Sequence, residues 1–521
     1  MLKIFFADLT HTYITLANGT FPLGAAYVAS YVKEVLGDDV DITLFKYPEK
    51  LEEKIGAGDY PDVFMYSSYL WNEYLGAAFA KEIKRISPKT LVISGGPNIS
   101  KERDKQKKFL EKNPFIDFFI LNEGEVAAAE LLCCYIGKNY CIESLKRSLV
   151  RQSLAIYEGE LLVGEAIDRI GVKKGEYVEL RSDKQSHSVS VLDDIPSPYL
   201  NGMMDQFFDN KLYPLVETNR GCPFACTFCQ QGVDYFNSVA VRRSDMVEKE
   251  LEYVAQRMVE ESPGIARIEF ADPNFAMFKQ DLKTTEFIYQ LQGKYGWPKI
   301  IGCSTGKNKP GQVIEAVEKV MPNSLIISNS MQSTNLDTLN EIKRSNISLE
   351  SYTQIQSDIQ SRGLRSMADV ILGLPLETKE SHFNAIYSLI DSGVQEFTSY
   401  QAMVLKSTEL EERSSADKYG LVTKSRVLPR AMGLYKINNT VVPVADVETI
   451  IVSTDTLSFD DYLSSRVLHL LAGIYHNSGV FNVIDNILKK NDINKSKIIS
   501  VLHQRVEKKS SRILLMVDEF I

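Results

Sequence analysis

The chain has 521 residues, of which 44% are hydrophobic and 24% are charged, and its formal net charge is −9. This composition excludes disordered, collagenous and coiled-coil proteins, and the length predicts three or four domains. An acidic balance disfavours general binding of nucleic acid. The sequence contains no run of 18 apolar residues, so no membrane span is predicted. Asp8 interrupts the first apolar stretch too early for a secretory leader. Seven cysteines in such a chain favour a reducing, cytoplasmic location and metal or redox use over disulfides.

Residues 1–150 alternate short apolar runs with stretches of helical spacing. The apolar runs predict five strands: Leu2–Leu9, Asp41–Tyr47, Asp62–Tyr69, Thr90–Pro97 and Asp117–Glu123. Helical spacing is clearest over Leu23–Leu36, and helices are also expected near Glu73–Ile86 and Lys101–Glu111. This alternation predicts an α/β fold with a Rossmann-like parallel sheet covered on both faces. Such a sheet binds ligands at the carboxyl ends of its strands.

Residues 151–205 interrupt this alternation and are predicted to form a connector. Ala155–Ala166 predicts a hairpin that turns at Glu158-Gly159. Ile195-Pro196-Ser197-Pro198 predicts an extended break, because a residue that precedes proline avoids helical conformation.

The alternation of strand and helix patterns returns in residues 206–420. Six strands are expected: Leu212–Thr218, Ala266–Ala271, Lys299–Ser304, Ser324–Ser328, Met367–Leu372 and Glu396–Ala402. Six such units predict a partial (β/α)6 TIM-type barrel, whose chemistry would lie at the carboxyl ends of the strands. Residues 421–521 lose the alternation, and helical spacing over Phe459–Ile474 and Val480–Lys490 predicts a mostly helical C-terminal region.

Three cysteines directly after the first expected barrel strand are the strongest chemical signal. Cys222, Cys226 and Cys229 have the spacing C-x3-C-x2-C. Three thiolates on one short loop can hold three corners of an iron–sulfur cluster and leave one iron open to another ligand. Zinc in a closed structural site would need a fourth protein ligand, and the neighbouring sequence offers none. We therefore predict that the three cysteines bind the metal of a catalytic 4Fe-4S cluster.

The same stretch resembles the signature of the radical S-adenosylmethionine (SAM) superfamily, C-x3-C-x-aromatic-C, with Phe228 as the aromatic residue. In that superfamily the open iron binds SAM. One electron, supplied by an external reductant of the flavodoxin or ferredoxin type, then cleaves SAM to a 5′-deoxyadenosyl radical. The resemblance implies a radical enzyme in which the cofactors carry the difficult chemistry and the protein positions them.

Three later segments resemble cofactor-facing elements of the same superfamily and follow in the same order. By that resemblance, the pair after the second barrel strand lies near the amino group of SAM, and the pair after the fourth lies near its ribose and carboxylate. The segment Gly-Leu-Pro-Leu-Glu-Thr after the fifth strand lies along the adenine. The residues assigned in this way are Asp272, Asn274, Gln332, Ser333, Gly373, Pro375 and Glu377.

The first domain resembles the cobalamin-binding domain that precedes many radical enzymes. The similarity lies in Phe21-Pro22-Leu23-Gly24, Ser94-Gly95-Gly96-Pro97 and Glu123-Gly124-Glu125. Glycines at strand ends allow a backbone to approach a large flat ligand. The residues assigned to cobalamin are Pro22, Gly24, Ser67, Gly95, Gly96, Glu123, Gly124 and Glu125.

Many cobalamin domains carry D-x-H-x-x-G, whose histidine binds cobalt from below. The corresponding stretch here, Asp8-Leu9-Thr10-His11-Thr12-Tyr13, has a different spacing. We therefore expect His11 to be a polar loop residue and cobalamin to bind without a lower histidine ligand.

The resemblances imply a cobalamin-dependent radical SAM enzyme, first of all a methyltransferase for an unactivated carbon of a small molecule or biosynthetic intermediate. The same cofactors can also support a cyclisation, a ring contraction or another rearrangement. Methylthiotransfer needs a second set of three cysteines, and the remaining cysteines are unsuitably spaced for it. A corrinoid or iron–sulfur sensor without catalysis is a further alternative. Tyr400, Lys307 and Cys303 are expected near the barrel mouth, but no residue there identifies a substrate.

Overall fold

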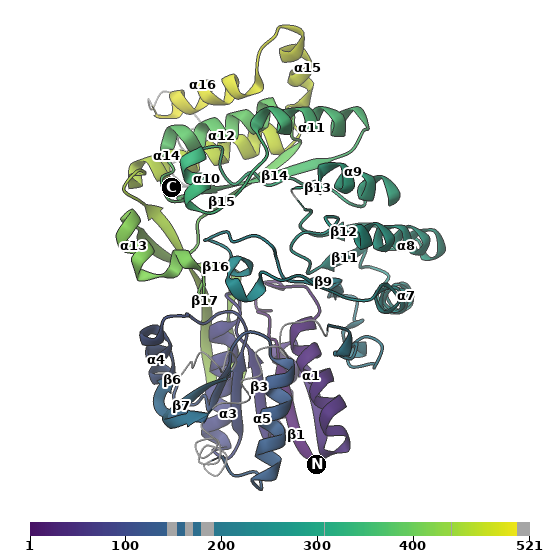
Figure 1. Cartoon of the computed structure of the whole chain (residues 1–521), viewed down its shortest axis with the longest axis vertical. Coiled ribbons are helices and arrows are strands. Elements are labelled where there is room, and N and C mark those ends of the chain that lie inside the picture. Colours follow the sequence, from purple (N-terminus) through teal and green to yellow (C-terminus); the bar gives the residue numbers. More distant parts are fainter. Residues whose placement is uncertain (143–153, 162–169, 179–191, 307, 439, 508–521) are drawn as a thin grey trace.

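The computed structural model describes residues 1–142, 154–161, 170–178, 192–306, 308–438 and 440–507. Lys307 and parts of the expected connector therefore lie outside the described residues. A first α/β domain, an open barrel, a long β-hairpin and C-terminal helices follow one another along the chain (Figure 1). No helix within the described ranges is both long and apolar enough to cross a lipid bilayer.

All five strands expected in the first domain are present. They are β1 (Leu2–Ala7), β2 (Val40–Phe45), β3 (Val63–Ser67), β4 (Leu91–Gly95) and β5 (Phe118–Ile120). They pair in parallel in the order β2-β1-β3-β4-β5. The connection after β1 leads to β2 on one side of it, whereas the connection after β3 leads to β4 on the opposite side. The crevice at the carboxyl ends of β1 and β3 is therefore the expected ligand site of this topology.

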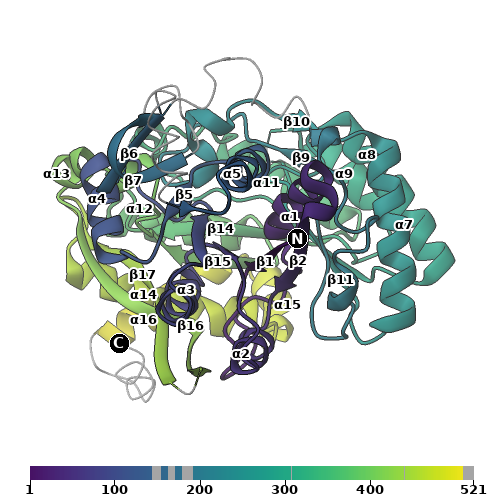
Figure 2. The ribbon, with the colours of Figure 1, turned by 90° about the horizontal axis from the view of Figure 1, so that it is seen from below.

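Helices cover both faces of this sheet (Figure 2). One face carries α1 (Leu23–Leu36) and α5 (Glu125–Gly137). The other face carries α2 (Pro48–Gly56), α3 (Glu73–Ile86) and α4 (Arg103–Lys112). Successive side chains of a strand point to opposite faces, so Ile4 and Phe6 pack beside α1 and α5, whereas Phe5 packs beside α2 and α3. This double burial explains why the strand sequences are continuously apolar.

The hairpin expected within Ala155–Ala166 is wrong. Strand β6 (Leu154–Leu161) runs through Glu158-Gly159 and pairs with β7 (Ile170–Val178). Strand β7 also pairs antiparallel with β5, so the two strands extend the first sheet. An edge strand carries unpaired backbone groups, and added strands satisfy them. This requirement of β5 cannot be seen in the sequence of the connector.

Six parallel strands form the partial barrel expected from the sequence. One sheet contains β8 (Leu215–Val216), β11 (Arg267–Phe270) and β12 (Ile300–Gly302), and the other contains β13 (Ile327–Ser328), β14 (Ser366–Leu372) and β15 (Glu396–Gln401). A bridge between Ile301 and Leu325 joins the two sheets. The outer helices are α7 (Ser244–Glu261), α8 (Lys279–Tyr295), α9 (Pro310–Lys319), α10 (Leu336–Glu341), α11 (Leu349–Ser361) and α12 (Lys379–Asp391) (Figure 1).

The expectation of a helical region from residue 421 onward is wrong for its first part. After α13 (Arg413–Tyr419), the chain forms a long antiparallel hairpin of β16 (Val422–Ile437) and β17 (Thr440–Ser453). Buried positions alternate along both strands, as expected for a ribbon with one covered face. The expected helices then follow as α14 (Phe459–Ala472) and α15 (Asn482–Lys490), and α16 (Lys495–Glu507) ends the described chain.

This hairpin connects the barrel to the first domain (Figures 1 and 2). Near its base, Val404 N donates to Thr449 O at 2.9 Å, which attaches β17 to the segment after β15. Near its tip, Tyr435, Ile437 and Val444 are buried in the same apolar cluster as the side chains of α2 and α3. The hairpin therefore fixes the first domain beneath the barrel.

Candidate functional site

The cysteine loop lies between β9 (Asn219–Arg220) and a short strand β10 (Ala240–Val241) that pairs with it. Gly221 has φ +103°, and a Cβ atom there would lie 2.1 Å from Ser238 O. Only glycine fits this turn. Cys222 N donates to Phe236 O at 2.7 Å, so the first cysteine is held against the segment that leads into β10.

The rest of the loop is attached to the barrel. Thr227 N donates to Ile342 O at 3.2 Å, and Leu410 N donates to Thr227 O at 3.0 Å. Phe228 packs in an apolar cluster with Leu339, Leu374 and other barrel residues. Backbone bonds and apolar packing therefore hold the loop against the barrel.

The three thiols share a secluded environment. Cys222 and Cys226 are each 8% exposed, and Cys229 is half-buried. Burial raises the pKa of Cys229, and the neighbouring Cys226 and Cys222 add to the shift. Among the described residues, no three His, Cys, Asp or Glu side chains could hold a single metal ion. A four-iron cluster puts each thiolate on a different corner iron, so its ligands stand farther apart than those of one ion.

Two polar side chains contact these thiols. Asn274 Nδ2 lies 3.3 Å from Cys222 Sγ. The guanidinium of Arg344 lies beside the Cys226 thiol; burial lowers the pKa of Arg344, and that thiol opposes the shift. Arg344 Nε also donates to Asn346 Oδ1 at 3.0 Å. A buried cation at this place stabilises thiolate over thiol.

Asp272 ties the second barrel strand to the strand that leads into the cluster loop. Its Oδ1 accepts from Thr218 N at 2.8 Å, and its Oδ2 accepts from the Thr218 hydroxyl and from Asn219 Nδ2, the latter at 2.9 Å. Burial raises the pKa of Asp272 to about 8, although the bonds from Thr218 and Asn219 lower it. Asp272 therefore bonds to the protein's own backbone and side chains, two residues before Asn274.

The segments after the fourth and fifth barrel strands meet one another. Gln332 has φ +63° and its N donates to Asp369 O at 2.8 Å. Buried atoms Gln332 Oε1 and Asp369 Oδ1 have no hydrogen-bond partner among the described residues. Ser333 is fully buried and hydrogen-bonds Glu377. Two buried acceptors without a described partner thus lie in bonded segments of the barrel, one after β13 and the other within β14.

The Gly-Leu-Pro-Leu-Glu-Thr segment is covered by the hairpin. A Cβ at Gly373, which has φ +89°, would lie 3.1 Å from Ile451 O of β17. Pro375 and Glu377 are buried, and Glu377 O accepts from Thr456 Oγ1 at 2.8 Å. The hairpin therefore closes one side of this part of the barrel.

The buried Glu377 gives a testable pH dependence. Burial raises the pKa of Glu377 to about 7, against an opposing effect of Ser333 and Ser381. In the unfolded chain the carboxyl loses its proton near its usual pKa of 4.5, so between these values only the folded chain keeps it. Stability should therefore fall as pH rises from about 4.5 to 7, by about 3 kcal/mol in total.

We expect Glu377→Gln to flatten this decline in the melting temperature, measured by calorimetry between pH 5 and 8. Glu380→Gln, on the exposed side of the same helix start, is the matched control and should behave as wild type. An unchanged slope in Glu377→Gln would contradict the assignment.

In the first domain, the loops at the carboxyl ends of β3 and β4 are bonded together. Ser68 N donates to Gly95 O at 2.7 Å. Gly96 has φ +110°, and a Cβ there would lie 2.7 Å from Ser68 O. Ser67 Oγ donates to Asp8 Oδ1 at 2.6 Å, which directs that hydroxyl into the protein. Ser68 Oγ is buried without a partner among the described residues, and so is the better candidate to meet a ligand.

An aromatic pair follows β3 at the same edge. Tyr69 and Trp71 stack with ring centroids 4.5 Å apart. Trp71 Nε1 is buried and has no partner within the described chain. A Cβ at Gly24 would lie 3.0 Å from the Tyr69 hydroxyl, so Pro22 and Gly24, at the start of α1, adjoin this pair. The sequence analysis missed both aromatic residues, because nothing in a single sequence marks them.

The Glu123-Gly124-Glu125 turn reaches the barrel. Gly124 precedes α5 and Glu125 is its first residue. Arg220 Nη1 lies 3.0 Å from Glu125 Oε1 and 3.5 Å from Glu123 Oε1. This expected cofactor segment therefore also forms an ion pair with the strand that precedes Cys222.

His11 differs from the expected polar loop residue. It follows β1 but is fully buried. Its Nδ1 lies 2.8 Å from the Tyr435 hydroxyl, and its Nε2 lies 2.7 Å from Asp446 Oδ2. Both partners belong to the hairpin, which arrives from the far end of the sequence. His11 is thus a buried contact between the first domain and the hairpin.

Comparisons with known proteins agree with these two adjoining sites. Residues 12–132 match the B12 binding domain family. The chain is 29% identical over 381 residues to the cobalamin-dependent radical SAM methyltransferase TokK of Streptomyces tokunonensis, covering 71% of this chain and 50% of TokK. It is 27% identical over 457 residues to a 2-(S-pantetheinyl)-carbapenam-3-carboxylate methyltransferase of Streptantibioticus cattleyicolor, covering 85% of this chain and 61% of that relative. These matches support the cobalamin-binding radical SAM family as the family that the chain resembles. The family expected from the sequence is confirmed.

The chain spans about half to three fifths of the length of those two relatives. Its fold is similar to the structure of the radical SAM methyltransferase TsrM from Kitasatospora setae with tryptophan and a SAM analogue bound. The TM-score is 0.54 at 12% identity, and the alignment covers 82% of this chain and 79% of TsrM.

The structure describes two of the residues expected at the barrel mouth, Tyr400 and Cys303. Tyr400 is 47% exposed, and burial together with the nearby Asp369 carboxylate raises its pKa. Burial raises the pKa of Cys303 well above its usual value, with a further contribution from Asp272, so its thiol is a weak nucleophile. Asp369 was missed by the sequence analysis, since it lies in no recognisable motif, and Arg344 was assigned no role there.

Proposed function

We propose that the chain is a cobalamin-dependent radical SAM methyltransferase that acts on an unactivated carbon of a small molecule or biosynthetic intermediate. The observation that carries this proposal is the contact between the cysteine loop and the carboxyl edge of the B12-binding sheet. Gln230, next to Cys229, donates through Nε2 to Pro97 O at 3.2 Å. A radical generator in the barrel and a methyl donor on the first domain would therefore face the same space. The names of both relatives support methyl transfer.

The cysteine loop fits a 4Fe-4S cluster. Cys222, Cys226 and Cys229 provide three soft ligands on a loop that is already fixed, and one iron would remain open for SAM. When bound, the cluster and SAM supply the electron and the radical that an unactivated C–H bond requires. The chain itself buries the thiols, and Asn274 donates toward Cys222 Sγ. Hydrogen bonds to cluster sulfur raise the reduction potential of such centres.

The barrel also fits SAM. Gln332 Oε1 and Asp369 Oδ1 are free acceptors suited to ribose hydroxyls. Arg344, buried beside Cys226, is suited to a carboxylate. We propose Asn274 near the amino group, with Asp272 holding its turn, and Gly373, Pro375 and Glu377 along the adenine with Ser333 beside them.

The first domain fits a corrinoid at the carboxyl ends of β1 and β3. Ser68 Oγ and Trp71 Nε1 are buried polar atoms without described partners. A Cβ at Gly24 would lie 3.0 Å from the Tyr69 hydroxyl and one at Gly96 2.7 Å from Ser68 O, so these glycines allow close packing beside the two polar atoms. We propose that cobalamin binds without a lower histidine ligand, because both ring nitrogens of His11 are already engaged by the hairpin.

The partners and location follow from the same chemistry. The substrate would be a small molecule, and an external one-electron reductant of the flavodoxin or ferredoxin type would supply electrons. The net charge of −9 argues against nucleic acid as substrate. Seven free cysteines support a reducing, cytoplasmic location.

One anaerobic experiment tests the proposal. The chain is reconstituted with iron, sulfide and hydroxocobalamin, freed of unbound material, reduced and given SAM. We expect one 4Fe-4S cluster and one corrinoid per chain, with formation of both 5′-deoxyadenosine and S-adenosylhomocysteine. Formation of 5′-deoxyadenosine alone from a corrinoid-loaded chain would favour a rearrangement, and bound cofactors without any SAM cleavage would favour a sensor. Failure to retain corrinoid would overturn the proposal.

A further inference from the structure

A buried arginine joins the cysteine loop to the B12-binding domain. The Arg220 side chain is 13% exposed and ends β9, two residues before Cys222. Its Nε and Nη2 donate to the two carboxylate oxygens of Glu217 at 2.9 and 2.8 Å. Its remaining nitrogen, Nη1, points to the other domain and lies 3.0 Å from Glu125 Oε1 and 3.5 Å from Glu123 Oε1. One guanidinium therefore holds carboxylates from both sides of the domain junction.

The short backbone segment between Arg220 and Cys222 couples the positions of these two residues. Arg220 pairs with Ala240 of β10, and Cys222 N bonds to Phe236 O. Gly221, between them, has φ +103°, and a Cβ there would lie 2.1 Å from Ser238 O, so the turn packs against the segment before β10. Because Arg220 and Cys222 are two residues apart and are both bonded to the segment around β10, we expect a displacement of Arg220 to move Cys222.

The partner carboxylate is equally fixed. Glu125 is 6% exposed and is the first residue of α5, directly after the carboxyl end of β5. This is the edge of the sheet at which a ligand of the first domain is expected. The Arg220 guanidinium also lies over the Tyr27 ring of α1, at 5.7 Å from its centroid. The junction thus links the cluster side of the barrel to the ligand edge of the first domain.

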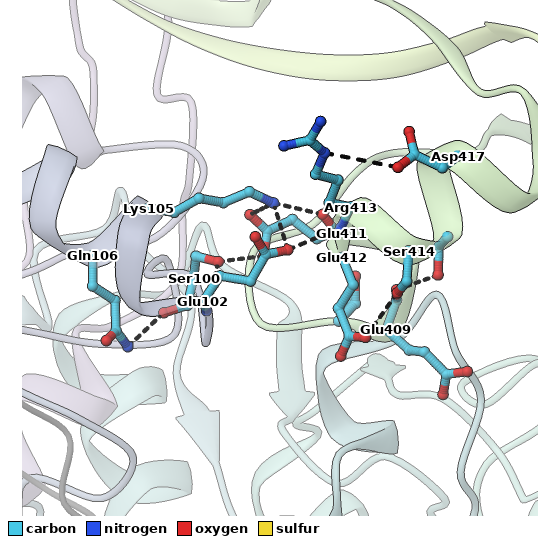
Figure 3. Close-up of polar contacts among 12 residues, drawn as sticks. Ser100, Glu102, Lys105, Gln106, Glu409, Glu411, Glu412, Arg413, Ser414 and Asp417 are labelled. Atoms are coloured by element: carbon cyan, nitrogen blue, oxygen red, sulfur yellow. Dashed lines mark hydrogen bonds and ion pairs between the residues drawn. The ribbon is translucent and has the colours of Figure 1, made fainter.

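Figure 3 shows a second polar junction, between α4 of the first domain and the segment after β15. Its cation is more exposed than Arg220. Lys105 Nζ, at the start of α4, lies 3.0 Å from Glu411 Oε1, and the Lys105 side chain is 38% exposed. Water and salt weaken an exposed pair far more than a buried one. The Lys105 junction is therefore a matched control for the Arg220 junction.

We propose that Arg220 is a positioning residue that, through Glu125, sets the separation between the cluster-binding loop and the cobalamin edge of the first domain. This inference rests on the proposed function, since it concerns the two cofactors assigned there. The planar guanidinium serves Glu217 and Glu125 at once, whereas a lysine ammonium cannot present the same fork. Cleavage of SAM at the cluster needs only the barrel, but methyl transfer depends on the relation between the two domains.

The test uses the full chain loaded with cluster and hydroxocobalamin and reduced until both centres are paramagnetic. Pulsed electron paramagnetic resonance then measures the distance distribution between the cluster and cobalt in wild type, Glu125→Gln, Arg220→Lys and Lys105→Gln. The same samples receive SAM, and the ratio of S-adenosylhomocysteine to 5′-deoxyadenosine is measured. Iron and corrinoid contents are recorded for each variant.

We expect a single narrow distance in wild type and in Lys105→Gln. Glu125→Gln and Arg220→Lys should show a shifted or broader distribution, and their product ratio should fall about 10²-fold. If Glu125 positions the loop, its variant keeps its corrinoid. Loss of corrinoid from Glu125→Gln would make Glu125 a cobalamin contact, as the motif predicts, and would overturn the inference. If Arg220→Lys loses iron, the result for Glu125→Gln is used to judge the inference, because this variant leaves the contact of Arg220 with Glu217 intact.

The inference would be overturned if Glu125→Gln had the distance distribution and the product ratio of the wild type. It would also be overturned if Lys105→Gln changed both quantities as much as Glu125→Gln does. Absence of cluster or corrinoid from the wild-type chain would instead refute the proposed function, so the two failures can be told apart.

Discussion

Replacing Cys222, Cys226 or Cys229 with alanine should abolish both the cluster and SAM cleavage. A cluster held by three thiolates keeps one iron for SAM, and loss of a further ligand leaves a second iron without protein support. The loop itself should survive, because its backbone bonds to Ile342 and Phe236 do not involve the thiols. Iron and sulfide content, the visible absorption of the reconstituted chain and the yield of 5′-deoxyadenosine measure the effect, which should be complete.

Cys303→Ala is the matched control for these three variants. Cys303 lies after β12, outside the loop; its side chain is half-buried, and burial raises the pKa of its thiol. This variant should keep the cluster and near-normal 5′-deoxyadenosine formation. Normal cleavage in any of the three loop variants would refute the assignment of the cluster ligands.

Asp446→Ala should destabilise the chain by about 3 kcal/mol without removing its corrinoid site. Both side chains of the His11–Asp446 pair are fully buried. Asp446 Oδ1 also accepts from Tyr74 N at 2.7 Å, so the substitution takes a partner away from the buried His11 ring and from the partly buried Tyr74 N. Chemical denaturation measures the loss, and hydrogen exchange should show earlier opening of β16 and β17.

His11→Ala tests the same contact from the first domain. Together with Asp446→Ala it forms a double-mutant cycle, in which the double variant should lose less stability than the sum of the two single variants. Tyr435→Phe removes only the hydroxyl bonded to Nδ1 and should cost about 1 kcal/mol. Each variant should retain hydroxocobalamin. A large loss of corrinoid in His11→Ala alone, with unchanged stability, would indicate that His11 is a cobalt ligand after all.

The fold could be predicted where local pattern and tertiary role agree. The strands of the first domain are buried on both faces, so each is a short apolar run between turn residues, and all five are present near the expected places. The barrel strands were recognised for the same reason. The hairpin of β16 and β17 was not expected, because its stability comes from contacts with the first domain and with the segment after β15.

The candidate site divides in a similar way. The spacing of Cys222, Cys226 and Cys229 is local, since one short loop must present all three thiols. Arg344 and Asp369 come from separate segments and converge only in the folded barrel. Ser67 illustrates the limit of motif reasoning, because its hydroxyl is directed to Asp8 while that of its neighbour Ser68 lacks a partner among the described residues.

The sequence by itself determined the α/β class, the cysteine loop and the family, because these depend on periodicity and spacing within short segments. Only the tertiary structure decided that Arg220 pairs with Glu125 and that His11 is held by Asp446. These partners are separated by 95 and 435 residues. Burial and charge pairing between distant segments leave no periodic trace in a single sequence, since either partner alone has the composition of an ordinary loop.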